Sequence, residues 1–177
     1  MVTQWIERIL VRDLEAMKLE IAAFPTDQAV WAIPPGIANS AGTLALHVAG
    51  NLRHFVGGVL GGSGYLRDRA HEFAARHLPR EVLLGELEAA GAAVRTALVS
   101  GRPIDLAAEF PEPVGGFRVT TGDFLIHLAT HLAFHLGQVG YLRRIVADSP
   151  TSVGGVGIPG LASAVKVPPT SAERFLR

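Results

Sequence analysis

The chain has 177 residues, 49% of them hydrophobic, with sixteen basic residues balanced by sixteen acidic ones and no cysteine. This length suits one domain around one core, and the missing cysteines exclude disulfides and thiolate ligands. Neither charge sign forms a long block, no long apolar run is free of charged residues and histidine, and the start lacks a secretory pattern, so we expect a soluble cytoplasmic protein without nucleic-acid or membrane partners.

The first helix is predicted over residues 3–24, where apolar side chains recur at helical spacing. These positions are Ile6, Leu10, Leu14, Met17, Ile21 and Phe24. Pro25 lacks an amide donor and disfavours helix at the residue before it, so the chain should turn there.

A second helix is predicted to start at Asn39 or Ser40, either of which can cap it, and to end at the glycine-rich run 61–64. Its inward stripe includes Leu44, His47, Val48, Asn51 and Phe55. Three glycines at 50, 57 and 58 lower helix propensity by roughly 1 kcal/mol each, which indicates close helix packing or a distortion.

Residues 65–79 form a polar segment that can cross over a bundle, and we expect its His71 and His77 to lie on the surface. A third helix is predicted over residues 80–99, and it should end at Gly101 and Pro103. Its apolar side consists of Leu83, Leu87, Ala90, Val94 and Leu98. Residues 106–121 then predict a long connection with a short hairpin around Gly115 and Gly116.

The fourth helix is predicted over residues 121–147, with Thr120 or Thr121 as its cap. Steps of three and four residues give its inward stripe. That stripe is Phe124, Leu128, His131, His135, Gln138, Leu142 and Ile145. Four long helices without a strand pattern predict an all-α bundle, and residues from Asp148 onward read as an irregular tail.

The histidine pair of the fourth helix is the strongest functional signal. Side chains four apart on a helix lie about 5–6 Å from each other, so His131 and His135 can bind one ion, and His47 faces inward from the second helix. The simpler interpretation is that the three are core histidines, each satisfied by one donor and one acceptor. The residues alone leave both interpretations open.

Neither histidine-bearing helix offers a carboxylate beside its imidazoles, with none in residues 29–66 or 124–147. The pair therefore lacks the glutamate base of a His-Glu-x-x-His protease, and no Glu-x-x-His motif of a di-iron bundle occurs. Neutral nitrogen ligands suit zinc, nickel, copper or iron better than magnesium or calcium.

Residues 5–146 resemble the DinB/YfiT-like metal-binding four-helix proteins, a damage-inducible family. The resemblance is carried by LALHVAGNLRHFVG and by DFLIHLATHLAFHLGQVGYLRR, whose ending is similar to the family's His-x-x-x-His-x-Gly-Gln. It implies an up-down-down-up type four-helix bundle with long connections, in which His47, His131 and His135 bind a divalent transition metal, zinc or nickel above all. The family commonly has arginine where this chain has Leu136, so any substrate contact of that arginine is in doubt.

Four more residues are candidates for contacts around the metal. Asn51 and Gln138 lie about one turn after His47 and His135, so each can orient an imidazole, or can serve as a bundle amide. His127 and His54 lie further along the same helices, where packing or supporting roles are preferred to metal ligation. The sequence does not identify a catalytic residue.

The resemblance implies a metal-dependent enzyme, a thiol S-transferase, isomerase or hydrolase that activates water or a low-molecular-weight thiol and acts on a small molecule. The alternative is a metal-binding or stress-response bundle without catalysis. We expect residues 1–148 to form the metal-binding domain and 149–177 the tail. The apolar surface and small residues such as Gly57, Gly58, Ala89, Ala92 and Ala93 predict a homodimer, unless the tail folds back over that surface.

Overall fold

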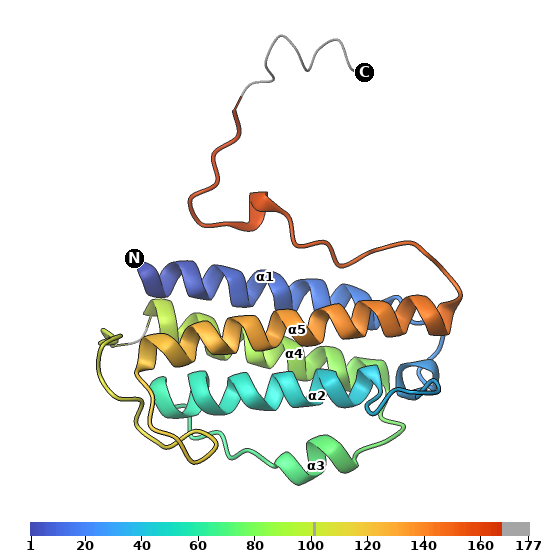
Figure 1. Ribbon diagram of the computed structural model, residues 1–177, viewed down its shortest axis with the longest axis horizontal. Coiled ribbons are helices and arrows are strands. Elements are labelled where there is room, and N and C mark those ends of the chain that lie inside the picture. The colour runs from blue at the N-terminus through green and yellow to red at the C-terminus, as the bar shows by residue number, and fades with distance from the viewer. Residues whose placement is uncertain (101, 168–177) are drawn as a thin grey trace.

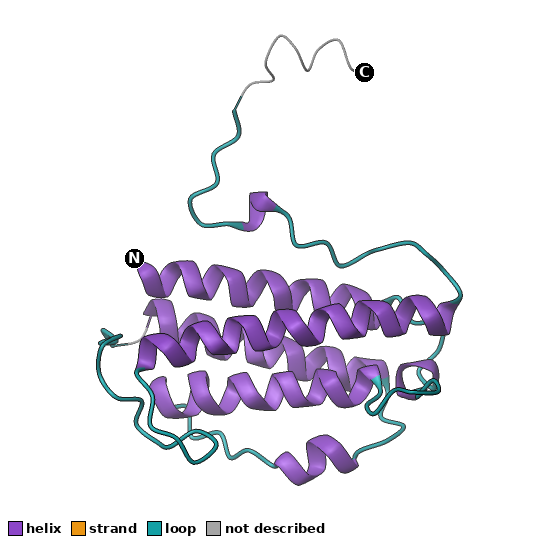
Figure 2. Cartoon of the chain, in the orientation of Figure 1, coloured by secondary structure: helices purple, strands orange, loops and turns teal. Residues whose placement is uncertain are grey.

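The computed structural model describes residues 1–100 and 102–167 and contains five α-helices (Figures 1 and 2). These are Val2–Ala22 (α1), Ala41–Leu52 (α2), Arg69–Ala74 (α3), Arg80–Arg95 (α4) and Thr121–Ala147 (α5). Two π-helical segments, Arg53–Leu60 (η2) and Thr96–Ser100 (η3), extend α2 and α4, and short 3-10 turns lie at Ala29–Trp31 (η1) and Ile158–Gly160 (η4). The described residues include isolated bridges but no strand, which confirms the all-α prediction.

The four long helices pack around one core. In Figure 1, α1, α2, α4 and α5 run alongside one another, and α3 lies outside the bundle against α2. Helix α1 contacts α4 and α5, and α2 contacts the same two helices from the other side. The apolar positions predicted for the first and third helices are all buried, so their stripes were predicted correctly.

Helix α2 is buried at every position from Ala41 to Leu52. The Ser40 side chain caps it by accepting a hydrogen bond from the backbone N–H of Thr43. Beyond Leu52 the chain continues as the π-helical η2, where a Cβ on Gly57 would lie 2.9 Å from the Cβ of Ala93 on α4. Both expectations for the glycines are therefore confirmed, since this helix is distorted and packs closely.

The connection between α4 and α5 contains the predicted hairpin in its shortest form. Val114 and Phe117 exchange backbone hydrogen bonds of 2.8 and 3.0 Å across Gly115 and Gly116, which have φ of 58° and 86°. Such left-handed pairs suit glycine at a tight hairpin turn. Phe110, which precedes the hairpin in the same connection, is buried in the core. Gly101, the predicted end of the preceding helix, lies outside the described residues.

Helix α5 has the predicted bounds and is capped by Thr120, but its predicted inward stripe is partly wrong. Ile145 is 57% exposed and Gln138 is exposed, although Phe124, Leu128 and Leu142 are buried. The predicted positions average 3.5 residues per turn, and a straight helix drifts by about 20° per heptad from that repeat. The buried stripe follows 3.6 residues per turn instead. The centre line of this stripe is formed by Leu125, Leu128, Leu132, Leu136, Val139 and Arg143, with Phe124 and Leu142 buried beside it.

The described part of the tail leaves the end of α5 and runs back on the outer side of α1 as irregular chain with the turn η4, which contacts α1 (Figure 1). It reaches a buried ion pair in which the Arg143 Nε donates to Glu20 Oε2 over 2.7 Å. The other oxygen of Glu20 accepts from the backbone N–H groups of Val153 and Gly154 at 3.4 and 3.1 Å, and Arg143 donates to the carbonyl of Thr151. The tail thus completes the polar partners of this pair. Residues 168–177 of the predicted tail lie outside the described part.

The length and apolar character of the helices bear on membrane insertion. Over the described residues, no helix combines the length and hydropathy that a membrane crossing requires.

Candidate metal centre

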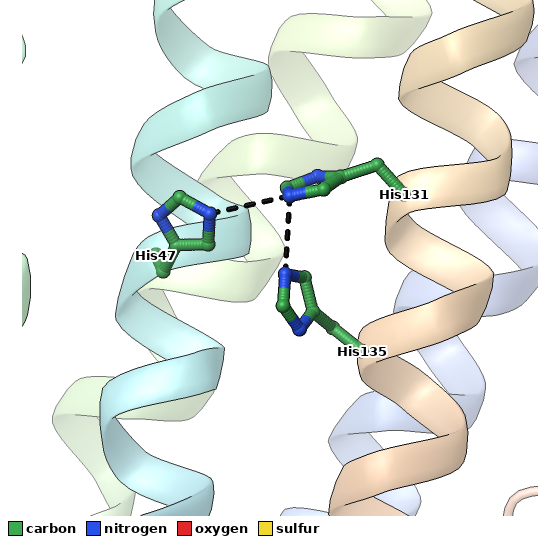
Figure 3. Close-up of side chains that lie close together, drawn as sticks. All are labelled: His47, His131 and His135. Atoms are coloured by element: carbon green, nitrogen blue, oxygen red, sulfur yellow. Dashed lines mark hydrogen bonds between the residues drawn. The ribbon is translucent and has the colours of Figure 1, made fainter. Parts of the chain in front are cut away.

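Three histidines from two helices converge between α2 and α5 (Figure 3). The Nε2 atom of His131 lies 3.3 Å from His47 Nε2 and 3.0 Å from His135 Nε2. Each side chain offers one ligand nitrogen, and these nitrogens all lie within 4.8 Å of one another. The structure therefore brings together the three residues that the sequence suggested as ligands.

Helical geometry explains this convergence. His131 and His135 lie one turn apart on α5 and border its buried stripe, so both rings are half-buried and point towards α2. His47 lies in the middle of α2 and is only 9% exposed. Two neighbouring helices thus place three imidazoles at one point without a loop.

The second ring nitrogen of each triad histidine, Nδ1, is here called the distal nitrogen. The distal nitrogen of His47 contacts a charged pair from the crossover between α2 and α4. Its Nδ1 lies 3.2 Å from Glu72 Oε2 and 3.3 Å from Arg67 Nη2. Arg67 donates two hydrogen bonds to Glu72, one of 2.7 Å from Nε to Oε1 and one of 2.8 Å from Nη2 to Oε2. Glu72 is 4% exposed, so this carboxylate is buried against the imidazole and the guanidinium.

Glycine at position 50 makes room for this carboxylate. A Cβ built on Gly50 would overlap Glu72 Oε1, and the next carboxylate atom would lie 2.9 Å away. Asp68 caps α3 by accepting a hydrogen bond from the N–H of His71, which fixes the short helix that carries Glu72. Sequence reasoning missed Glu72 and Arg67, although a glycine three residues after His47 was a signal that something approaches α2 closely.

Hydrogen bonds at the distal nitrogens determine which imidazole nitrogens are free. An ionised carboxylate only accepts and a guanidinium only donates, so His47 Nδ1 cannot bond both Glu72 and Arg67. We assign the proton of His47 to Nδ1, where it donates to Glu72 over the shorter distance of 3.2 Å, and the 3.3 Å approach of Arg67 Nη2 is then a contact without a hydrogen bond. His135 Nδ1 lies 2.7 Å from Gln138 Oε1 and by the same reasoning donates to it. The Nε2 atoms of His47 and His135 are then unprotonated, and both face His131 Nε2, which can donate to only one of them. Unshared lone pairs remain at the centre of the triad.

The environment of His131 and His135 favours their neutral forms. Burial is the main cause that lowers the pKa of His131 to about 4, followed by the charges that His135 and His47 would carry. Burial also lowers the pKa of His135, opposed by its bond to Gln138. At Glu72, burial alone would raise the pKa, but the bonds to Arg67 and His47 outweigh it and the net shift is downward. Glu72 therefore remains ionised beside His47.

We expect the metal-free protein to lose stability as the pH falls from about 6.5 towards 4. The unfolded chain takes up protons near pH 6.5 whereas folded His131 does so near 4, so acid favours unfolding across this window. The loss from His131 is at most about 3 kcal/mol, less the part that solvent screens. Urea unfolding of the metal-free protein at pH 7.5 and 4.5 measures it. His131→Ala should reduce the pH dependence, and an unchanged slope would contradict the assignment.

The remaining candidates lie outside the triad. His54 Nε2 lies 2.8 Å from Glu112 Oε1 on the hairpin connection. His127 is exposed and stacks between the rings of Phe124 and His131, with centroids 5.9 and 5.8 Å away. Asn51 is buried, and its Oδ1 has no hydrogen-bond partner within the described residues.

Of the four supporting residues suggested by the sequence, only Gln138 makes a hydrogen bond to a triad histidine among the described contacts. His71 and His77 are exposed, as expected.

The donor set fits a divalent transition metal. Three neutral imidazole nitrogens are ligands that zinc, nickel, copper and iron accept, with zinc–nitrogen bonds of about 2.0–2.1 Å. Two of the distal nitrogens are bonded to a carboxylate and an amide oxygen, the usual arrangement behind ligating histidines. The three-histidine group can therefore hold such an ion.

Most of the chain, including the positions of the triad, matches a known protein family. A family model described as the DinB superfamily matches residues 10–139, which is most of the chain and includes all three histidines. The chain belongs to the DinB superfamily. No significant match was found among curated proteins or among solved structures. In this DinB-superfamily chain the match ends at Val139, so the last turns of α5 and the tail lie beyond it.

Proposed function

We propose that this DinB-superfamily protein binds one divalent transition metal, zinc or nickel, through His47, His131 and His135. The observation that carries the proposal is the convergence of three Nε2 atoms. Our assignment of the His47 and His135 protons to Nδ1, where Glu72 and Gln138 lie, leaves two of these three atoms without a proton. A set of hydrogen-bonded core histidines would alternate donors and acceptors. Here two acceptors face His131 Nε2, which can donate to only one of them, so one acceptor stays unpaired until a cation lies between the three.

The bound metal would supply Lewis-acid activation of a water molecule or a low-molecular-weight thiol, and we propose transferase, isomerase or hydrolase chemistry on a small molecule. Within the chain, Glu72 and Arg67 hold the His47 ring, and Gln138 holds the His135 ring. Glu72 accepts from both Arg67 and His47, so it is better suited to positioning than to moving protons.

The alternative is a metal-binding protein without catalysis. It is favoured by the fact that both oxygens of Glu72 already accept hydrogen bonds from Arg67 or His47, so Glu72 is not free to act as an acid or base. No second carboxylate contacts the triad among the described contacts, so an acid or base would have to come from the substrate or from elsewhere in the chain.

The proposal includes an up-down-down-up bundle, which is supported by the directions in which the four long helices run in Figure 1. The cytoplasmic location remains a prediction.

Metal analysis of protein purified without a histidine tag tests the metal site. About one equivalent of zinc or nickel per chain is expected, and a chain that takes up neither metal would contradict the proposal. Turnover of thiol acceptors and of ester and amide panels by metal-loaded protein then separates the enzyme from the non-catalytic alternative.

We expect Glu72→Gln to weaken metal binding by about 10- to 100-fold, as found for partners that orient ligating histidines. Glutamine fills the same space beside Gly50 but removes the charge that fixes the Nδ1 proton of His47. Competition with a chromophoric chelator measures the affinity. Glu86→Gln is the matched control, because Glu86 pairs with Arg53 away from the triad. Equal affinities of the two variants would argue against this role of Glu72.

Homodimerisation also remains a proposal, but its structural support has changed. Gly57 and Ala93, two of the small residues that suggested a partner helix, contact each other across η2 and α4 within one chain. The tail contacts α1 through η4, and Phe134, Tyr141 and Ile145 on α5 remain exposed. Light scattering on the full chain measures the oligomeric state.

A further inference from the structure

A cavity of about 550 Å³ lies between the second half of α5 and the loop that leads into α2. The loop contributes Gly36 to Asn39, and α5 contributes residues from Phe134 to Ile145. Ligand pockets typically have volumes of about 300–1,000 Å³. The cavity is therefore large enough for a small organic molecule.

The lining of this cavity is apolar and carries no charge. No Asp, Glu, Lys, Arg or His side chain contributes to it, and its polar side chains are the amides of Asn39 and Gln138 and the hydroxyl of Tyr141. Phe134, Tyr141 and Ile145 are 64%, 67% and 57% exposed, which leaves large apolar area in contact with water. Covering that area would be favourable, so the cavity suits an uncharged aliphatic or aromatic group.

Two contacts connect the cavity with the histidine triad. Gln138 lines the cavity and its Oε1 accepts from His135 Nδ1, and the ring of Phe134, another lining residue, lies 5.4 Å from the ring of His135. A ligand in the cavity would thus lie against side chains that touch a proposed metal ligand.

Glycine at position 137 keeps the cavity open. It belongs to the lining on α5, and a Cβ built there would meet no atom within 4 Å. A larger side chain at this position would extend into open space without disturbing the bundle, and it would gain helix propensity over glycine. Gly85 on α4 is a second exposed helical glycine with no atom within 4 Å of its Cβ position, and it does not belong to the cavity lining.

From these observations we propose that the cavity beside Gln138 binds the uncharged apolar arm of the substrate while its reactive head lies at the triad. The substrate class is accordingly a small molecule with an aliphatic or aromatic group next to its metal-binding head. This inference rests on the proposed metal site for the position of the head, but the cavity can be tested without the metal.

The test uses the full chain loaded with zinc and a series of straight-chain hydroxamates, from acetohydroxamate to octanohydroxamate. The hydroxamate head binds the metal and the chain reports on the cavity. Titration calorimetry should show affinity rising by up to about fourfold for each added methylene group. Gly137→Leu and Tyr141→Asp should abolish the rise, each variant being compared with its own acetohydroxamate affinity. Gly85→Leu should retain it.

A series with the same affinity at every chain length would overturn the inference, as would a rise that survives in Gly137→Leu and Tyr141→Asp. If the protein takes up no zinc, the metal proposal fails and the cavity is tested in metal-free protein with the uncharged fluorophore N-phenyl-1-naphthylamine. Binding to the unaltered chain and to Gly85→Leu, but not to Gly137→Leu, would support an apolar pocket. Absence of binding to the unaltered chain, or dimerisation through this surface, would overturn it.

Discussion

Replacing His131 with alanine is expected to lower the affinity for zinc or nickel by more than about 100-fold. Losing a residue that only orients a ligand costs about 10- to 100-fold, and His131 is itself a proposed ligand. It is also the central one, because its Nε2 lies within 3.3 Å of both other Nε2 atoms. Chelator competition measures the affinity, and circular dichroism confirms that the bundle remains folded.

The bundle should tolerate this change, because the His131 ring is half-buried and lies beside the buried stripe of α5. His71→Ala is the control, since His71 is an exposed histidine on α3 whose side chain does not take part in the triad. It should bind metal as the unaltered chain does. Metal affinity retained by His131→Ala would refute the triad as the binding site.

The second large effect is expected from Arg143→Ala, which should destabilise the fold by about 3–5 kcal/mol. Arg143 and Glu20 are both at most 4% exposed, so removal of the guanidinium leaves an uncompensated carboxylate between α1, α5 and the tail. Urea unfolding at pH 7.5 measures the difference in the free energy of unfolding.

Two comparisons make this result specific. The double variant Glu20→Leu with Arg143→Met should recover much of the loss, because both charges leave the interior together. Arg118→Ala removes a 75% exposed partner of Glu109 and should cost less than about 1 kcal/mol. A loss below about 1 kcal/mol for Arg143→Ala would show that the ion pair is not buried in solution.

The long helices could be predicted because their signals are local. Helix α5 has a threonine cap and one apolar period over its whole length, and the predicted bounds of 121–147 agree with the structure. The prediction of its buried face was less accurate, because alternating steps of three and four residues describe a repeat of 3.5 residues per turn, whereas a straight helix has 3.6. Over 27 residues that error moves Ile145 from the core to the surface.

The histidine triad was predictable for a related reason, whereas the hydrogen bond between Glu72 and His47 was not. His131 and His135 share a face by spacing alone, and helix packing brings His47 to them. Glu72 reaches His47 from 25 residues further along the chain, through a crossover without a strong pattern. That contact depends on the path of the crossover in three dimensions, which no local sequence pattern specifies. The choice of Nδ1 as the protonated nitrogen follows from it, so the sequence could suggest three ligands but not their protonation.

The contact between the tail and the Glu20–Arg143 pair uses main-chain atoms: the carbonyl of Thr151 and the N–H groups of Val153 and Gly154. Every amino acid offers the carbonyl and every one except proline offers the N–H, so residue 151 can vary freely and residue 153 can be any residue but proline without loss of the anchor. Gly154 cannot, because a Cβ there would lie 2.5 Å from the carbonyl oxygen of Ala16. The tail is thus held in place by its backbone and by one glycine, in a segment whose side chains remain free to change.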